Sequence, residues 1–249
     1  MDKPRRAKAI PVDAPPDRKQ AILLAAEKLF AQQGYHAVSL RQIATEAAVP
    51  LSLVGYYYGA KHELFHAIFA HWNSTIEERL AALRSASHDA SDPQSLPLII
   101  EAFTGPVLRL RASAEGEYYA QLVARELLHA LEETDRVLRA YFDPLAHAFI
   151  DALHEALPHA MRGQIAWVYQ FALGALLNHL IDTRIERLSR KQAKRGDPAA
   201  SALLVKFIVG GMRAALPAPV APPPIARSSK KPISLTKAST TPTRRRRLP

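Results

Sequence analysis

The stretch from residue 39 to residue 61, SLRQIATEAAVPLSLVGYYYGAK, constrains the fold more than any other part of the chain. Ser39, with Gln42 three residues later, has the spacing of a capping box and predicts the start of a helix. Apolar residues at helical spacing follow until Pro50, which cannot continue a helix but suits the start of the next one. The sequence therefore predicts two short helices joined by a tight turn, which is a helix-turn-helix.

The second of these helices, residues 51–57, is expected to turn its small and neutral side outward. Val49 and Val54 can pack back onto the first helix, which leaves the outward side free to meet base edges in a DNA major groove. Lys61 follows at the start of the next helix, where its charge and the free backbone N–H groups can both meet a phosphate. The alternative is a helical corner that binds no DNA. The residues predicted to contact DNA are Ser39, Arg41, Gln42, Leu51, Ser52, Leu53, Gly55, Tyr56, Tyr57 and Lys61.

Residues 18–65 resemble the DNA-binding domain of the TetR family of transcriptional regulators. The matching segments are Ile22-Leu23-x-Ala25-Ala26-x-x-Leu29-Phe30-Ala31-x-x-Gly34-Tyr35, Ser39-Leu40-x-x-Ile43-Ala44, Ala48-Val49 and Tyr57-Tyr58-Gly59-x-Lys61-x-Glu63-Leu64-Phe65. The chain departs from the family pattern at Ala48, where glycine is usual, at Pro50, where serine or asparagine is usual, and at Gly55, where tyrosine is common. More loosely, residues 167–214 resemble a TetR-type effector domain. The resemblance implies a homodimer, a DNA operator and a small-molecule effector.

The net charge of +10 is concentrated at the two ends of the 249-residue chain. Residues 217–249 hold eight lysines and arginines and no acid, residues 1–16 carry +2, and residues 17–216 are left near neutral. Both ends are rich in proline and are expected to be disordered basic arms that attract DNA without regard to its sequence, or that merely aid solubility. Without cysteine, a secretory signal or a long apolar run, we expect a cytoplasmic, nucleoid-associated protein with no membrane contact.

The sequence between the arms predicts an all-α fold of about nine helices without strands. Beyond the first three, helices are expected at 61–85, 96–111, 117–131, 135–157, 161–190 and 197–216. The helix at 61–85 would connect the DNA-reading unit to the rest and act as a lever. The predicted organisation is an arm at 1–16, a DNA-binding domain at 17–63, a ligand-binding and dimerisation domain at 64–216 and a tail at 217–249.

The last two long helices are apolar over more than one face, which is typical of helices buried on several sides. They could be internal core, or they could pair with their copies in a second subunit as a two-fold four-helix bundle. The resemblance favours the dimer, because two recognition helices must reach successive major grooves. The predicted interface residues are Phe171, Ala175, His179, Leu204, Phe207 and Gly211.

A ligand pocket is expected between the effector helices. An arginine in an otherwise apolar pocket would suit a carboxylate or phosphate, although arginines paired with structural partners are the alternative. The residues predicted to border the pocket are Phe103, Arg109, Tyr118, Arg125, His129 and Trp167.

Ten histidines raise the question of a metal or catalytic site. Asp151 and His154 share one face of a helix, but a di-metal site needs matching ligands on several facing helices, and these cannot be assembled. No phosphate-binding loop, nucleophile elbow or zinc-protease motif is present either. The sequence therefore predicts a protein that is not an enzyme and has no metal or cofactor. The resemblance implies a repressor that leaves a palindromic operator when its effector binds. The alternatives are an architectural DNA binder that acts through basic tails and an all-α enzyme using residues 143–159.

Overall fold

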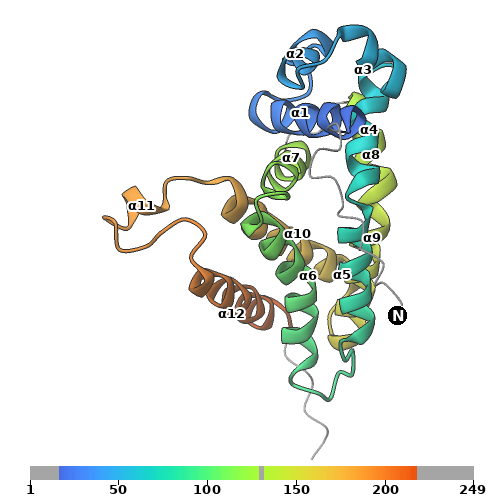
Figure 1. The fold of residues 1–249 in the computed structure, drawn as a ribbon. Helices are drawn as coiled ribbons and strands as arrows, with labels where there is room; N and C mark the ends of the chain where they lie inside the picture. Colours follow the sequence, from blue (N-terminus) through green and yellow to red (C-terminus); the bar gives the residue numbers. More distant parts are fainter. Residues whose placement is uncertain (1–16, 129–131, 218–249) are drawn as a thin grey trace, which may run out of the picture. The chain divides into compact units, whose positions relative to one another are not determined.

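The computed structural model describes residues 17–128 and 132–217, and all regular structure in these ranges is helical (Figure 1). The predicted basic arms, apart from Pro217, and His129 lie outside the described residues. No helix in these ranges is long and apolar enough to cross a bilayer. The helices are α1 (Arg18–Gln33), α2 (Leu40–Glu46), α3 (Leu51–Tyr58), α4 (Lys61–His71), α5 (Asn73–Ser85), α6 (Ser95–Ala112), α7 (Glu117–Leu128), α8 (Glu132–Tyr141), α9 (Asp143–Ala156), α10 (Arg162–Ile181), α11 (Ile185–Leu188) and α12 (Pro198–Ala215).

The helix-turn-helix forms as the sequence predicts. The side-chain oxygen of Ser39 accepts from the N–H of Gln42 at 3.3 Å, and the Gln42 side chain accepts from the N–H of Ser39 at 2.8 Å. These two bonds satisfy donors that the first turn of α2 would otherwise leave unpaired. Pro50 occupies the N-cap of α3 and supplies no side-chain bond there. Asp17 caps α1 by accepting from the backbone of residues 19 and 20.

The core of the N-terminal helices continues into the effector helices. Buried side chains of α1, α2 and α3 form one apolar cluster with four residues of α4, two of α7 and one of α8. The boundary predicted between residues 63 and 64 falls inside α4, and packing is continuous across it. The cluster consists of Ile22, Leu23, Ala25, Ala26, Leu29, Phe30, Ala31, Tyr35, Val38, Ile43, Ala44, Val54, Leu64, Phe65, Ile68, Phe69, Tyr119, Leu122 and Val137.

The prediction of a single helix over 61–85 is wrong, because the helix is interrupted at Trp72, between α4 and α5. Trp72 has φ −94° and ψ +10°, outside the helical range, and its carbonyl accepts from the hydroxyl of Thr75 at 2.7 Å. The indole N–H is bonded to the carboxylate of Glu27 on α1 at 2.7 Å. The break therefore comes from a tertiary contact and a local hydroxyl cap, with no proline or glycine involved.

Two further predicted helices are also interrupted. The stretch 135–157 divides into α8 and α9, with Pro144 in the first turn of α9, where its missing N–H leaves no bond unmade. The stretch 161–190 divides into α10, which ends at Ile181, and the four-residue α11. Between them, the carboxylate of Asp182 accepts from the N–H of Arg184 at 2.8 Å. These divisions explain why the described residues hold twelve helices in place of the nine predicted.

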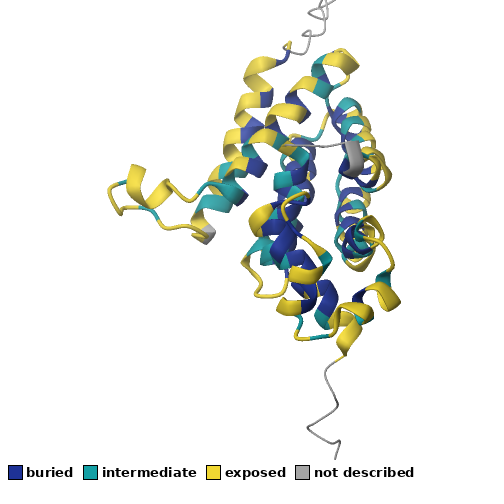
Figure 2. Cartoon of the chain, turned by 90° about the horizontal axis from the view of Figure 1, so that it is seen from above, coloured by how far each residue is buried: buried dark blue, intermediate teal, exposed yellow. Residues whose placement is uncertain are grey.

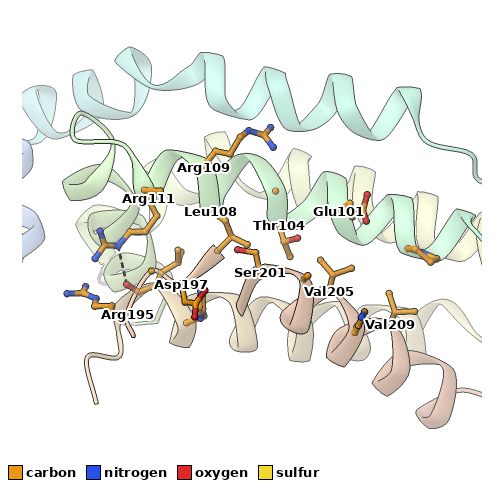
Figure 3. Close-up of a pocket in the computed structure, with 18 of the residues that line it drawn as sticks. Glu101, Thr104, Leu108, Arg109, Arg111, Arg195, Asp197, Ser201, Val205 and Val209 are labelled. Atoms are coloured by element: carbon orange, nitrogen blue, oxygen red, sulfur yellow. Dashed lines mark hydrogen bonds between the residues drawn. The ribbon is translucent and has the colours of Figure 1, made fainter. Parts of the chain in front are cut away.

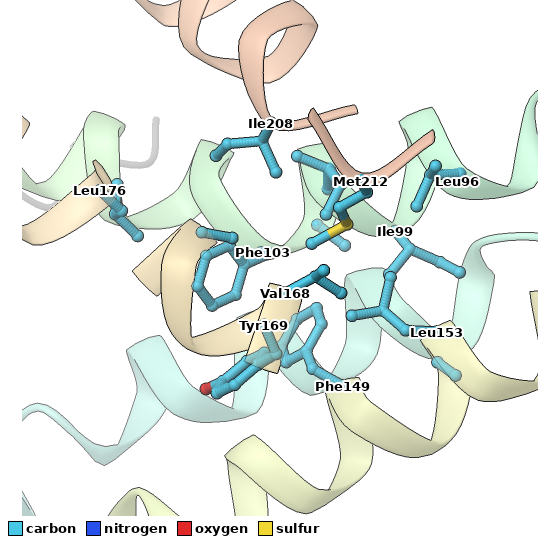
Figure 4. Packing of buried hydrophobic residues seen from close by; sticks show 14 of the residues in the cluster. Leu96, Ile99, Phe103, Phe149, Leu153, Val168, Tyr169, Leu176, Ile208 and Met212 are labelled. Atoms are coloured by element: carbon cyan, nitrogen blue, oxygen red, sulfur yellow. The ribbon is translucent and has the colours of Figure 1, made fainter. Parts of the chain in front are cut away.

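The effector core lies where α5, α6, α9, α10 and α12 pack together (Figure 4). Its aromatic centre is Phe103, whose ring lies 5.3 Å from that of Phe149 and 5.5 Å from that of Tyr169, centroid to centroid. Such tilted ring pairs are favourable beyond the area they bury. Buried residues line the inward faces of these helices, and exposed residues cover the outward faces (Figure 2).

Candidate nucleic-acid interface and effector cavities

The outward side of α3 is uncovered by the rest of the described chain. Tyr56 is 82% exposed, Leu51 is 44% exposed, and Ser52 and Gly55 are also exposed. A Cβ atom added at Gly55 would meet nothing within 4 Å, so the backbone itself can be approached there. Leu53 differs from the prediction, because it is half-buried and packs against the N-terminal core.

The opposite side of α3 is fixed to the helices beneath it. Val54 is completely buried, and Val49 packs at the edge of the same cluster, as the sequence predicts. The hydroxyl of Tyr58 donates to the carbonyl of Lys19 on α1 at 2.8 Å and ties the end of α3 down. One side of α3 is therefore packed on the core and the other is exposed, which is the arrangement that a recognition helix needs to enter a DNA groove.

The residues predicted to contact phosphates flank this face. Ser39, Arg41, Gln42 and Tyr57 are exposed, and Tyr57 packs edge-on against Tyr56 with centroids 5.2 Å apart. Lys61 is half-buried, and its ammonium group lies 4.4 Å from the ring centroid of Tyr35.

The start of α4 differs from the expected set of free N–H groups. The carboxylate of Glu63 reaches back to accept from the N–H of Ala60 at 2.7 Å. One of the donors expected to meet a phosphate is therefore already used within the chain, and Glu63 places a negative charge beside Lys61.

A second uncovered surface runs along α10 and α12 and is strongly apolar. Trp167 and Phe171 of α10 are each 65% exposed and stack on one another, and Leu203 and Phe207 of α12 are each 68% exposed. Large apolar side chains this exposed on two helices that contact each other indicate an interaction surface. Of the predicted interface residues, Phe171, Phe207 and Gly211 are exposed, whereas Ala175, His179 and Leu204 are half-buried.

Glycines on these two helices leave room for close approach by another chain. A Cβ added at Gly174 on α10, or at Gly210 or Gly211 on α12, would meet nothing within 4 Å. Small residues of this kind let helix backbones come near each other. The α10–α12 face, meaning Trp167, Phe171, Gly174, Leu203, Phe207, Gly210 and Gly211, is the candidate subunit interface.

A cavity of about 210 Å³ lies among α5, α6, α7, α9 and α10. Most of its wall is aliphatic or aromatic, and its polar members include Arg79, Tyr119 and Tyr169. Arg79 is buried, and burial lowers its pKa to about 10, which still leaves the guanidinium charged at neutral pH. The lining residues are Thr75, Ile76, Arg79, Pro106, Val107, Leu110, Tyr119, Ala120, Val123, Leu127, Phe142, Asp143, Leu145, Ala146, Tyr169, Gln170, Leu173, Leu176, Leu177 and Leu180.

None of the predicted pocket residues that the structure describes lines this cavity. Phe103 is fully buried in the core, Trp167 lies on the exposed α10–α12 face, and Tyr118 packs at the edge of the N-terminal core. Arg125 donates to the carbonyl of Gln33 at 3.3 Å and so joins α7 to the end of α1, which is the structural role named as its alternative. Sequence reasoning missed Arg79, although it lies between Ile76 and Leu83 on the apolar side of α5.

A larger cavity of about 1100 Å³ opens between α6 and α12, with Leu108 of α6 facing Ser201 of α12 (Figure 3). Two of its cationic residues, Arg109 and Arg111, have partners within the chain. Arg111 pairs with Glu117 at 2.9 Å and donates to the carbonyl of Leu180, and Arg109 pairs with Glu78 of α5 at 2.6 Å. Among the described members of the predicted pocket, Arg109 alone borders this space.

Trp72 connects the small cavity to the DNA-reading helices. Its ring stacks on that of Tyr119, which lines the cavity, with centroids 5.3 Å apart and planes 17° apart. Its N–H donates to Glu27, which is only 1% exposed within α1. Burial raises the pKa of Glu27 to about 7, although bonds from the Trp72 side chain and the Tyr119 backbone work against that rise.

The histidine-rich stretch 143–159 forms ordinary surface pairs. Asp151 pairs with Arg162, and Glu155 pairs with His88 on the chain between α5 and α6 at 2.9 Å. Within the ranges that the structure describes, no group of three or more His, Asp or Glu residues is arranged to hold a metal ion.

Two family models match the chain in order. Residues 22–68 match a model described as "Bacterial regulatory proteins, tetR family", and residues 101–211 match one described as "Tetracyclin repressor-like, C-terminal domain". Solved structures share the fold. The fatty acid degradation regulator FadR from Bacillus halodurans has a TM-score of 0.53 at 15% identity, covering 81% of this chain and 99% of that one. A TetR-like transcriptional regulator from Rhodococcus sp. RHA1 has a TM-score of 0.51 at 23% identity, covering 78% and 95%.

Curated relatives match over shorter stretches. The transcriptional regulator HbdR of Aromatoleum sp. (strain CIB) is 33% identical over 94 residues, which is 38% of this chain and 34% of the relative. The transcriptional activator FasR of Mycolicibacterium smegmatis is 30% identical over 100 residues, 40% of this chain and 43% of the relative. The chain thus spans less than half the length of these relatives. The two family models nevertheless describe both parts of one regulator in their usual order, so this chain belongs to the TetR family of bacterial transcriptional regulators.

Proposed function

We propose that this protein is a ligand-responsive transcriptional repressor that binds a palindromic DNA operator as a homodimer and leaves it when a small molecule binds. The observation that carries the proposal is the exposed face of α3. The opposite side of the helix is fixed by the buried Val54 and by the hydrogen bond from Tyr58 to α1. A solvated helix would gain from charged residues on such a face, yet Leu51, Ser52, Gly55 and Tyr56 occupy it. Small, hydroxyl and apolar groups suit base edges and thymine methyl groups.

Contacts to phosphates would fix the position of α3 in the groove. Ser39, Arg41 and Gln42 lie at the start of α2, Tyr57 lies in the last turn of α3, and Lys61 begins α4. Leu51, Ser52, Gly55 and Tyr56 would meet bases, with Leu53 at the margin. Phosphate contacts set register and affinity, whereas base contacts select the sequence.

Pairing through the α10–α12 face would supply the second recognition helix. Symmetric dimers bury the same patch on both subunits, and two helix-turn-helix units then reach half-sites one helical turn apart. The exposed rings of Trp167, Phe171 and Phe207 would be the anchors, since aromatic residues dominate interface energetics.

The effector would act from the cavity among α5, α6, α7, α9 and α10. Tyr119 in its wall stacks on Trp72, and Trp72 lies at the junction of α4 and α5 and is bonded to α1. A ligand that favours one arrangement of these helices would change the reach of the two α3 helices. A coupling free energy of about 3 kcal/mol would shift operator affinity about a hundredfold.

The test begins by selecting genomic DNA fragments bound by the full-length protein and confirming them by mobility shift over a salt series. Lys61→Ala should weaken binding to every fragment alike and reduce the salt slope by about one. Ser52→Ala and Tyr56→Ala should change which fragments are preferred. Arg84→Ala, an exposed arginine on α5, is the matched loss of one positive charge and should change neither property.

A second arm measures the subunit interface by light scattering and by the same mobility shifts. Phe171→Asp and Phe207→Asp should give monomers that lose palindrome binding, whereas Leu24→Asp on α1 should remain dimeric. The absence of any sequence preference in the wild-type protein, or operator binding that survives in monomers, would rule the proposal out.

A further inference from the structure

We propose that the cavity among α5, α6, α7, α9 and α10 binds a small apolar carboxylate whose anionic group pairs with the buried Arg79. This rests on the proposed function, because it names the chemical class of the effector. A buried charge that lacks a partner, the wall around it and the size of the space support this assignment.

Arg79 is a buried cation without a counter-ion. It is 7% exposed, and none of the ion pairs in the described part of the chain includes it. Its Nε–H has no hydrogen-bond partner. Asp143 lines the same cavity, but it is exposed and forms no ion pair with Arg79. Natural proteins rarely leave a buried charge in this state unless something else completes it.

Two phenylalanine rings partly stabilise this charge through cation–π interactions. The guanidinium carbon lies 5.1 Å from the ring centroid of Phe103 and 5.5 Å from that of Phe149. Aromatic faces attract a cation, but they accept no in-plane hydrogen bonds from its five N–H donors. The planar fork of donors is suited to a carboxylate, which can accept two bonds at once.

Phenol groups accompany the guanidinium in the wall. Tyr119 and Tyr169 line the cavity, and each lies close enough to Arg79 that the positive charge lowers the phenol pKa, although burial raises both pKa values overall. Neutral phenols at pH 7 can donate to a carboxylate oxygen but cannot themselves balance the arginine charge. Apart from the exposed Asp143, which forms no ion pair with Arg79, the polar wall therefore offers donors suited to an anion.

The rest of the wall sets the size and character of the ligand. Sites for drug-sized ligands typically measure about 300–1,000 Å³, so a cavity of about 210 Å³ fits a smaller molecule. Branched aliphatic side chains such as Val107, Val123 and Leu173 require an apolar body. A one-ring or short-chain acid satisfies both requirements.

The experiment measures binding to the full-length protein by calorimetry. The probes are benzoate, phenylacetate and hexanoate, each paired with its primary amide, which has nearly the same shape but no charge. We expect at least one acid to bind at millimolar concentration or below, about ten- to a hundredfold more tightly than its amide. Failure of all three acids to bind, or equal binding of acid and amide, overturns the inference.

Arginine variants locate the charge that is responsible. Arg79→Met should abolish the preference for acid over amide. Arg109→Met removes an arginine from the neighbouring helix α6 that already pairs with Glu78, and it should leave the preference intact. A preference that survives in Arg79→Met, or that is lost in Arg109→Met, contradicts the assignment to Arg79.

The ligand-free protein gives an independent readout. Replacing a buried charge that lacks a partner with an apolar side chain of similar length is often neutral or stabilising, so the Tm of Arg79→Met should equal or exceed that of the wild type. A clear fall in Tm would show that Arg79 has a structural role and would count against the inference. Without probes, Arg79→Met and the wild type should bind the operator equally. Operator binding therefore tests the proposed function separately, and a failed carboxylate test would not contradict it.

Discussion

The buried carboxylate Glu27 beside the N-terminal core and the buried guanidinium Arg79 beside the effector core are satisfied in opposite ways. Glu27 in α1 accepts a hydrogen bond from the Trp72 indole at 2.7 Å and a further bond from the Tyr119 backbone. Arg79 in α5 has two aromatic rings against it, but within the described residues its Nε–H is unpaired and no carboxylate pairs with it. Both groups are almost inaccessible to water.

This difference matches what the two regions are proposed to do. A DNA-reading unit must hold one geometry, and a buried polar group whose bonds are complete favours a single arrangement of helices. A ligand-binding core needs polar groups whose hydrogen bonds are completed only when the ligand binds. Trp72 connects the two regions, because its ring stacks on the cavity residue Tyr119 and its N–H is bonded to Glu27. The comparison can be tested first at Trp72.

Trp72→Ala should have the largest effect on stability. It removes the ring stacked on Tyr119 and leaves the Glu27 carboxylate without its side-chain donor, so the free energy of unfolding should fall by about 3–4 kcal/mol. Urea denaturation at pH 7 measures it. Trp72→Phe keeps most of the ring and loses only the N–H, so it should lose about 1–2 kcal/mol. If the two variants lose the same amount, the hydrogen bond accounts for the whole effect and the stacking contributes nothing.

The second test is the pH dependence of stability contributed by Glu27. Its pKa is about 7 in the folded protein and near 4.5 when unfolded, so the folded state binds more protons between these values. The contribution of Glu27 to the free energy of unfolding therefore falls as pH rises from about 4.5 through 7, by at most about 3 kcal/mol. Glu27→Gln should remove this slope, and subtracting its curve from the wild-type curve cancels the histidines. Identical slopes in the two proteins would mean that Glu27 ionises normally.

The two regions also differ in how far their structure could be predicted. In the N-terminal unit the signals are local: the Ser39–Gln42 box, the stop at Gly34 and the restart at Pro50 lie within a few residues of the boundaries that they set. Residues at the exposed side of α3 follow from helical spacing alone, with Leu53 as the exception. Short-range sequence signals suffice where short-range bonds decide the structure.

In the effector region the decisive contacts join residues far apart in the chain. The break at Trp72 depends on Glu27, which lies 45 residues earlier, and on a local contribution from the hydroxyl of Thr75. The small cavity is enclosed by five helices, so no single stretch of sequence predicts its walls. Pro144 and the position of Arg79 on the apolar side of α5 were local signals that the helical periodicity obscured.

The smallest expected effect concerns the one strained position in the otherwise well-satisfied helix-turn-helix. Ala48 has φ +52°, in the left-handed region that favours glycine, and it stands where the family usually has glycine. Left-handed geometry costs a residue with a Cβ about 1–2 kcal/mol, while glycine gives back part of this through the greater freedom of the unfolded chain. Ala48→Gly should therefore raise the free energy of unfolding by about 0.5–1 kcal/mol.

Ala47→Gly is the matched control, because Ala47 has φ −77° in the ordinary helical region. There glycine relieves nothing and only adds freedom to the unfolded chain, so stability should fall by about 0.5–1 kcal/mol. Urea denaturation of both variants at one pH gives the comparison. Opposite signs at adjacent positions would show that the turn holds Ala48 in its strained geometry because Val49 and Val54 are anchored in the core. A loss at both positions would mean that the turn relaxes around Ala48, and the DNA-reading unit would then be less rigid than its hydrogen bonds suggest.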